Sequence, residues 1–261
     1  MGWLADSEFN AVGKFERMAR QTTKGDTVKI LKLALCAAAA SAALSGAAMA
    51  QDDTAPTFAF NVGATSDYLF RGLTQTAKDP AVFGGVDMTA GMIYAGAWAS
   101  TVDFADAEVD LYAGVKPVAG PVTFDLGVIY YGYVGSDVSN AAYWEGKVAA
   151  SIPAGEGTLG VAYYYSPEFF GKTGKADYYE LNGSMPLPFA GATISGAVGR
   201  QSLARGSYGV DGYSTWNAGV TVPFLSKLSV DLRYVYTDDD AKIACVGCSS
   251  NKIVGTIKAS F

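Results

Sequence analysis

The feature that most constrains this chain is a strict alternation of apolar and polar residues over segments of about ten residues. An alternation with a period of two predicts a β-strand with one apolar and one polar face. No helical periodicity competes with it after Phe58. Twelve such segments recur, at about 58–73, 81–89, 92–102, 108–116, 122–134, 142–152, 158–166, 177–185, 192–201, 213–222, 228–237 and 252–261. The sequence therefore predicts an all-β fold of about twelve strands.

The two faces of the predicted strands differ in a way that favours a membrane barrel. The polar faces carry charges at mid-strand, and the apolar faces end in aromatic residues such as Trp144, Trp216 and Phe261. A soluble sandwich also alternates, but it turns its apolar face inward. An apolar outside, a polar inside and aromatic girdles are typical of transmembrane barrels. We expect a transmembrane antiparallel up-and-down β-barrel, since only closure satisfies every backbone group in lipid.

The connections between the segments alternate in length. "KPVAGP" and "IPAGEG" are short and tight, whereas "SPEFFGKTGKAD" and "DDDAKIACVGCSSN" are long and polar. Short inner turns and longer outer loops are typical of outer-membrane barrels, and an even strand number places both termini on the periplasmic side. Ile257 and Phe261 on the last strand are then the expected insertion signal for the barrel assembly machinery.

The N-terminal region predicts targeting rather than barrel structure. Residues 28–50 join Lys29 and Lys32 to an apolar run and to Ala48-Met49-Ala50, which is typical of a cleavable secretory signal helix. A buried Ala-rich helix is the alternative. We interpret residues 1–27 as an upstream extension that is not part of the protein, because translation would begin at Val28. The alternative is that they form a long n-region of the signal. Residues 51–57 form a short segment before the barrel at 58–261.

Composition excludes several classes of function. The sequence contains no histidine, so it can build no Ser-His-Asp triad, Cys-His pair or His-bearing metal site. We expect no enzyme, cofactor or metal. Residues 1–50 hold six of the 19 basic and four of the 25 acidic residues, so their removal leaves a net charge of −8. Such a chain lacks the basic footprint of a nucleic-acid-binding protein.

Two cysteines remain after the predicted signal, Cys245 and Cys248 in the last long loop. In an oxidising, exported setting we expect a local disulfide between them. A redox motif would need a βαβ context, and a metal site would need more soft ligands. The neighbouring acids Asp238, Asp239 and Asp240 lack the glycine and glutamate of a calcium loop. We interpret them as a solvent-exposed run of acidic residues that contacts cations bound to lipopolysaccharide.

The first segment carries a resemblance to a known family. "SDYLFRGLTQT", followed by "PAVFGGVDM" and "IYAGAWASTVDF", resembles the N-terminal signature of the TorF-like porins of Gram-negative outer membranes. The resemblance covers about 52–261 and is strongest over 58–112. It implies an outer-membrane β-barrel that passes small hydrophilic solutes, with no catalytic residues. The alternative is a non-conducting structural or adhesive barrel that acts through its outer loops.

The polar parity of the segments predicts which side chains line the pore. In the first strand Tyr68 and Phe70 face lipid, while Asp67 and Arg71 face the lumen as a filling ion pair or a charged constriction. The candidate pore-lining residues are Asp67, Arg71, Asp87, Glu108, Asp110, Asp125, Glu145, Lys147, Glu180, Asp231 and Arg233. With Lys116, Lys252 and Lys258, eight acids face six bases, which supports a slight cation preference. Twelve strands predict a narrow, partly obstructed bore.

We predict that the mature protein begins at Gln51 and fractionates with outer-membrane lipid. Cleavage after Ala50 leaves no later apolar span to hold the chain in the inner membrane. Intact-mass measurement of the membrane-extracted protein checks this, and a mass that includes residues 28–50 would contradict it.

Overall fold

The structure, a computed structural model, describes residues 55–261. The predicted extension at 1–27, the signal peptide at 28–50 and residues 51–54 lie outside this range. The long strands are β1 (Thr57–Thr65), β4 (Ala81–Ala90), β5 (Ile93–Ser100), β6 (Ala107–Val115), β8 (Val122–Val134), β9 (Tyr143–Ala154), β10 (Gly157–Ser166), β11 (Ala176–Pro186), β12 (Thr193–Ser202), β13 (Gly212–Phe224), β14 (Leu228–Thr237) and β15 (Asn251–Ser260). The short elements are β2 (Leu69–Phe70), β3 (Leu73–Thr74), β7 (Val118–Ala119), the 3-10 helix η1 (Phe170–Lys172) and the helices α3 (Arg205–Tyr208) and α4 (Asp240–Ala244).

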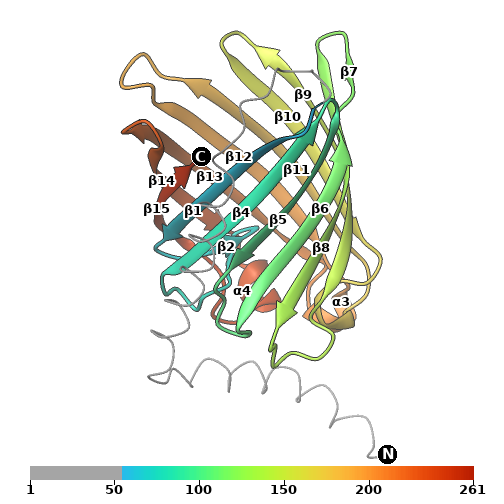
Figure 1. Cartoon of the computed structure of the whole chain (residues 1–261). Helices are drawn as coiled ribbons and strands as arrows, with labels where there is room; N and C mark the ends of the chain where they lie inside the picture. Colours follow the sequence, from blue (N-terminus) through green and yellow to red (C-terminus); the bar gives the residue numbers. More distant parts are fainter. Residues whose placement is uncertain (1–54) are drawn as a thin grey trace, which may run out of the picture.

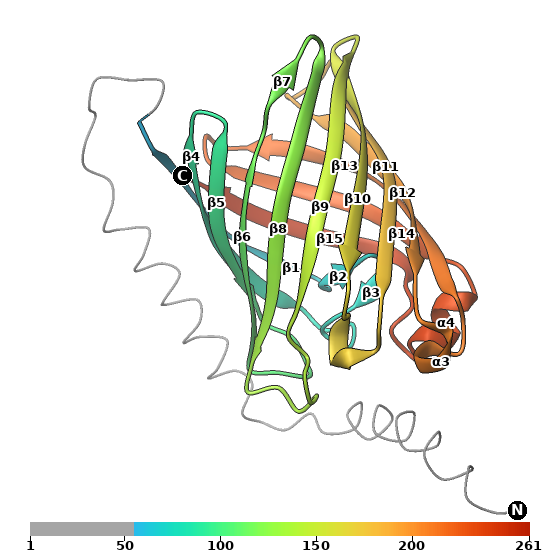
Figure 2. The same cartoon turned by 90° about the vertical axis from the view of Figure 1, so that its right-hand side faces the viewer.

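Within residues 55–261, the twelve long strands form one closed antiparallel barrel (Figure 1 and Figure 2). Each strand pairs with its neighbours along the chain, and β1 pairs with β15 to close the ring. The two-residue strand β7 lies on β8 beside the turn from β6. The prediction of an up-and-down barrel of about twelve strands is confirmed.

The wall of the barrel has an apolar outer face and a polar inner face. Leu181 on β11 is 53% exposed, and its partner Val161 on β10 is 54% exposed. Glu108 and Glu145, in contrast, are 1% and 2% exposed. Because the outer side chains have no protein neighbour to cover them, such a belt requires an apolar surrounding. Within the described residues, no helix is both long and apolar enough to cross a membrane.

The two ends of the barrel differ. Figure 1 shows α3 and α4 at the same end, and tight turns such as that beside β7 at the other. β15 runs away from α4, so its last residues lie at the end with the tight turns. There Phe60 and Phe261 exchange backbone hydrogen bonds of 3.1 and 2.9 Å. The final strand therefore closes the barrel next to the first.

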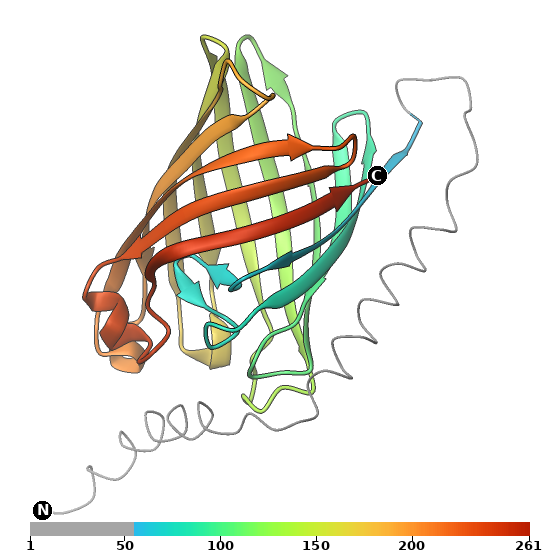
Figure 3. The ribbon, with the colours of Figure 1, turned by 90° about the vertical axis from the view of Figure 1, so that its left-hand side faces the viewer.

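One predicted boundary is wrong. The first strand was expected over 58–73, but β1 ends at Thr65 and the chain returns to the wall at Ala81. Between them, β2 and β3 pair as a small hairpin inside the barrel (Figure 3). The two residues between them, Arg71 and Gly72, have positive φ angles of 48° and 84°. Such angles belong to the tight two-residue turns of hairpins, and they break a strand whatever its polarity pattern.

We predict that Leu181→Arg impairs assembly far more than Asn182→Arg on the same strand. Leu181 faces outward, and a cation there costs up to about 2–4 kcal/mol near the middle of a bilayer. Asn182 faces the lumen beside Glu180, to which its amide donates a 2.9 Å hydrogen bond. Heat-modifiable mobility on gels measures the folded fraction, and equal loss in both variants would contradict the assignment of the two faces.

Candidate functional site

Arg71, at the tip of the β2–β3 hairpin, reaches the far wall of the lumen. Its Nη1 and Nη2 donate to Glu145 Oε1 and Oε2 at 2.9 and 2.6 Å, and Nη1 also donates to Gln201 Oε1 at 2.8 Å. The guanidinium carbon lies 4.4 Å from the ring centre of Tyr178 and 5.1 Å from that of Tyr164. The side chains of Arg71 and Glu145 are only 7% and 1% exposed. This is a two-pronged ion pair between aromatic rings, shielded from water.

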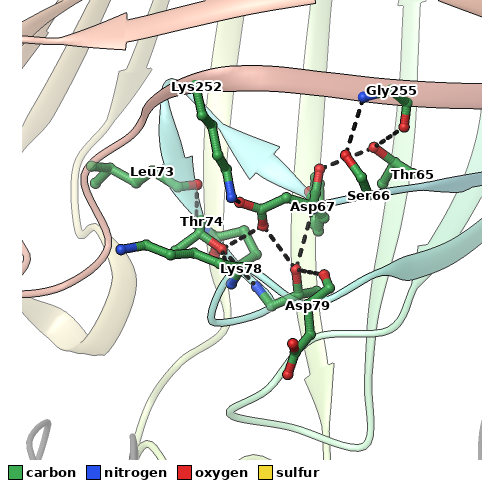
Figure 4. Close-up of polar contacts among 12 residues, drawn as sticks. Thr65, Ser66, Asp67, Leu73, Thr74, Lys78, Asp79, Lys252 and Gly255 are labelled. Atoms are coloured by element: carbon green, nitrogen blue, oxygen red, sulfur yellow. Dashed lines mark hydrogen bonds and ion pairs between the residues drawn. The ribbon is translucent and has the colours of Figure 1, made fainter.

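Asp67, at the base of the hairpin, binds the last strand. Its Oδ2 lies 2.5 Å from Lys252 Nζ, and its Oδ1 accepts hydrogen bonds from the hydroxyls of Thr74 and Thr76 at 2.5 and 2.9 Å (Figure 4). The expectation that Asp67 pairs with Arg71 is therefore wrong. The turn at Arg71 sends its side chain across the lumen, whereas Asp67 stays beside β15.

Tyr68 also points inward, contrary to the prediction that it faces lipid. Its hydroxyl donates to Glu108 Oε1 at 2.7 Å, and its ring lies 5.2 Å from that of Trp98. Phe70, placed in the same way by the sequence, lies with its ring 5.6 Å from that of Tyr131, a buried residue of β8. Both errors come from continuing the strand parity past Thr65, where the chain leaves the wall.

Asp110, next to Glu108 on the inner face of β6, is 8% exposed. Its Oδ1 is buried and has no hydrogen-bond partner among the described residues. Glu108 and Asp110 thus form the most acidic part of the wall beside the hairpin. No group of three or more acidic or cysteine side chains within residues 55–261 is arranged to hold a metal ion.

The half of the lumen near the tight turns holds two ionic groups. In the first, Lys147 Nζ lies 2.7 Å from Asp125 Oδ2, and Tyr94 donates to the same carboxylate at 2.6 Å. In the second, Arg233 Nη2 lies 3.1 Å from Asp231 Oδ2. The first pair joins β9 to β8, whereas Asp231 and Arg233 both lie on β14, which Arg233 joins to β13 by a 2.6 Å hydrogen bond to Asn217 Oδ1.

Two further acids face this half without a basic partner among the described residues. Asp87 accepts a 2.6 Å hydrogen bond from the hydroxyl of Tyr112. Glu180 accepts hydrogen bonds from Asn182 at 2.9 Å and Tyr178 at 3.2 Å. The candidate residues on the wall strands thus all point inward, but they divide into one group around the hairpin and another around the ionic pairs.

The last long loop covers the hairpin from outside. Cys245 and Cys248 are joined by a disulfide, and the Cys248 carbonyl accepts a 2.9 Å hydrogen bond from the Thr74 amide. Leu73 forms a bridge with Ser249. An apolar cluster lies at this mouth, formed by Ala176, Leu203, Tyr213 and Ala241, with Leu73, Phe169, Tyr208 and Ala244 packed against it. A small hydrophobic core therefore lies at the end of the barrel that carries α3 and α4.

Sequence reasoning missed Gln201 and the apolar cluster. Gln201 is 1% exposed and carries no charge, so a search for charged side chains passes over it. Its position in the alternation of the segment 192–201 would have placed its side chain on the inner face of the barrel. The cluster gave no signal, because its members come from three different loops and strand ends with no shared period.

We predict that Gly72→Ala destabilises the protein more than Gly91→Ala. Both glycines have positive φ, at 84° and 58°, so an alanine strains the backbone at each. A Cβ at Gly72 would lie 2.5 Å from Thr237 Cγ2 and 2.6 Å from Thr215 Oγ1, whereas Gly91 has no neighbour within 4 Å. The difference in unfolding free energy should be about 1–3 kcal/mol, the usual cost of overpacking. Urea titration in detergent measures it, and equal losses would show that the hairpin does not pack on the wall.

No curated protein matches this sequence. Among solved structures, a KdgM porin shares 8% identity over 79% of this chain and 99% of its own, with a TM-score of 0.51. A NanC porin shares 12% over 78% and 98%, with a TM-score of 0.48, and OpdL of Pseudomonas aeruginosa shares 12% over 78% and 67%, with a TM-score of 0.42. At such identities the likeness, carried by the KdgM porin, shows a shared barrel fold alone.

The family assignment rests on sequence. The resemblance to TorF-like porins stays a prediction, because the matching family has a different description. Residues 49–261 match the family described as "Bacterial protein of unknown function (Gcw_chp)", and the chain belongs to that family.

Proposed function

We propose that this protein is an outer-membrane channel of a Gram-negative bacterium, through which small hydrophilic solutes diffuse passively. The observation that carries the proposal is the closed barrel with an apolar outer belt and charged groups on its inner face. An apolar outside suits lipid, and a polar inside suits water. Both termini would then be periplasmic, because the longer loops with α3 and α4 belong at the outer surface.

The half of the lumen near the tight turns supports this proposal. It contains a cavity of about 310 Å³ lined by Phe83, Thr221, Ser229, Asp231, Thr256 and Lys258. Hydroxyls and charges of both signs replace the hydration of a small polar solute better than an apolar lining would. Nothing in this lining favours a catalytic reaction, and we propose no enzymatic activity.

Unpaired charges favour a slight preference for cations. Among the described residues, Asp87, Glu108, Asp110 and Glu180 face the lumen without a basic partner, and Lys116 and Lys258 without an acidic one. An excess of one sign in a low-dielectric cleft concentrates ions of the other sign. The net effect is small, since the remaining lumen acids are neutralised by bases.

The buried hairpin favours a second candidate, a non-conducting barrel that acts through its outer loops. Its contacts fill the outer half of the lumen, as described for Arg71 and for the apolar cluster. In either case we propose that the outer belt contacts lipid and lipopolysaccharide, and that Ile257 and Phe261 at the end of the chain engage the assembly machinery.

We predict stepwise single-channel conductance when the refolded protein is added to a planar bilayer, with a reversal potential in a KCl gradient that slightly favours potassium. Glu180→Gln should move this potential toward zero, since it removes an unpaired lumen charge. Glu156→Gln, in the exposed turn between β9 and β10, makes the same charge change outside the lumen and serves as the control. Absence of steps from folded protein would favour the non-conducting barrel.

A further inference from the structure

The segment from Ser66 to Pro80 leaves the barrel wall and enters the lumen. Its hairpin lies within the ring of strands in all three views (Figures 1 to 3). A hydrogen bond closes the base of the hairpin, where the Gln75 amide donates to the Tyr68 carbonyl at 2.8 Å. The segment is also hydrogen-bonded to β15, where the Ser66 amide donates to the Gly255 carbonyl at 2.9 Å. The segment is thus an ordered part of the lumen.

The side chains of the segment touch the wall in several directions. Tyr68 contacts β5 and β6, through Trp98 and Glu108. Arg71 contacts β9 and β12 through its ion pair and its bond to Gln201. Contacts on the opposite side of the segment are those of Gly72 with Thr215 and Thr237, and of Asp67 with Lys252. Because these contacts reach strands on all sides of the barrel, the hairpin spans the lumen.

Burial shows that water does not reach the ion pair of Arg71 and Glu145 or the carboxylate of Asp67 beside the wall. The side chains of Asp67 and Glu145 are 0% and 1% exposed, and that of Arg71 is 7% exposed. A water-filled passage at this height would expose these charged groups. Outside the hairpin, the apolar cluster with Leu73 forms a second layer, in which the Tyr208 hydroxyl is hydrogen-bonded to that of Thr173 at 2.9 Å.

We infer that residues 66–80 are a plug that closes the outer half of the lumen, with the Arg71–Glu145 ion pair as the latch that holds it across the bore. This inference rests on the proposed channel function and says what limits passage through it. The limiting aperture is set by the hairpin, and the number of strands sets only the width available once the hairpin is displaced.

A shortened hairpin tests the plug. Tyr68 and Gln75 already face each other across its base, so two glycines in place of residues 69–74 can join them without stretching the chain. This variant keeps the ion pair of Asp67 with Lys252 and the pairing of β1 with β15. We expect its single-channel conductance to exceed that of the wild type several-fold. Arg200→Ala is the control, because Arg200 lies on the outward face near the rim, with a 3.7 Å ion pair to Asp238.

A second variant keeps the test decisive if the shortened protein fails to fold. Arg71→Ala combined with Glu145→Ala removes both buried charges together, so neither is left unpaired, and it should also raise the conductance or its frequency of opening. Unchanged conductance in whichever of these variants folds, beside a conducting wild type, would overturn the plug but leave the channel function standing. A silent wild type with a conducting variant would support the plug and exclude passive flow through the resting barrel. Silence in all of them would contradict both proposals.

Discussion

In hydrocarbon there is no water to satisfy a backbone N–H or C=O group, so a sheet in a membrane has to close on itself. This chain closes over a short seam: β1 and β15 pair between Asn61 and Thr65 on one side and Thr256 and Ser260 on the other, and Phe60 and Phe261 add one more pair of backbone hydrogen bonds. Beyond Thr65 the inward segment takes over part of the pairing. The Ser66 hydroxyl accepts a 3.1 Å hydrogen bond from the Gly255 amide, and Thr74 bonds to the loop before β15. The segment that fills the lumen therefore also completes the wall.

A charged pair across the lumen is costly unless its geometry is good. Taking Arg71 and Glu145 out of water costs several kcal/mol per ion, and their attraction offsets this only with well-formed hydrogen bonds. The two-pronged contact with Glu145 and the Gln201 amide oxygen supply these hydrogen bonds, and the ring of Tyr178 adds a cation–π contact. Such a pair specifies one position of the hairpin more than it adds stability, because any displaced position leaves two unpaired charges in a confined space.

The strand number, the closure and the two faces were predictable, because a period of two over ten residues leaves little else for the backbone to do. Leu181 and Glu145 fall on the expected sides for this reason. The hairpin was missed because the parity of residues 58–65 was continued through it. The alternation breaks there, since residues 66 and 67 are both polar and residues 68–70 are all apolar, and the Arg71-Gly72 pair is a turn signal. The partners of Asp67 and Arg71 depend on where that turn points, which is set by packing against β13, β14 and β9, far away in sequence.

The central claim is that Arg71 reaches across the lumen to bind Glu145 out of contact with water. A double-mutant cycle measures this directly, from the unfolding free energies of the wild type, Arg71→Ala, Glu145→Ala and the double variant in detergent. Each single variant leaves a buried charge without its partner, at a cost of about 3–5 kcal/mol. The account predicts a coupling energy of about 2–3 kcal/mol, at the upper end for residues in one network. A coupling energy within about 0.5 kcal/mol of zero, as for an exposed pair, would contradict it.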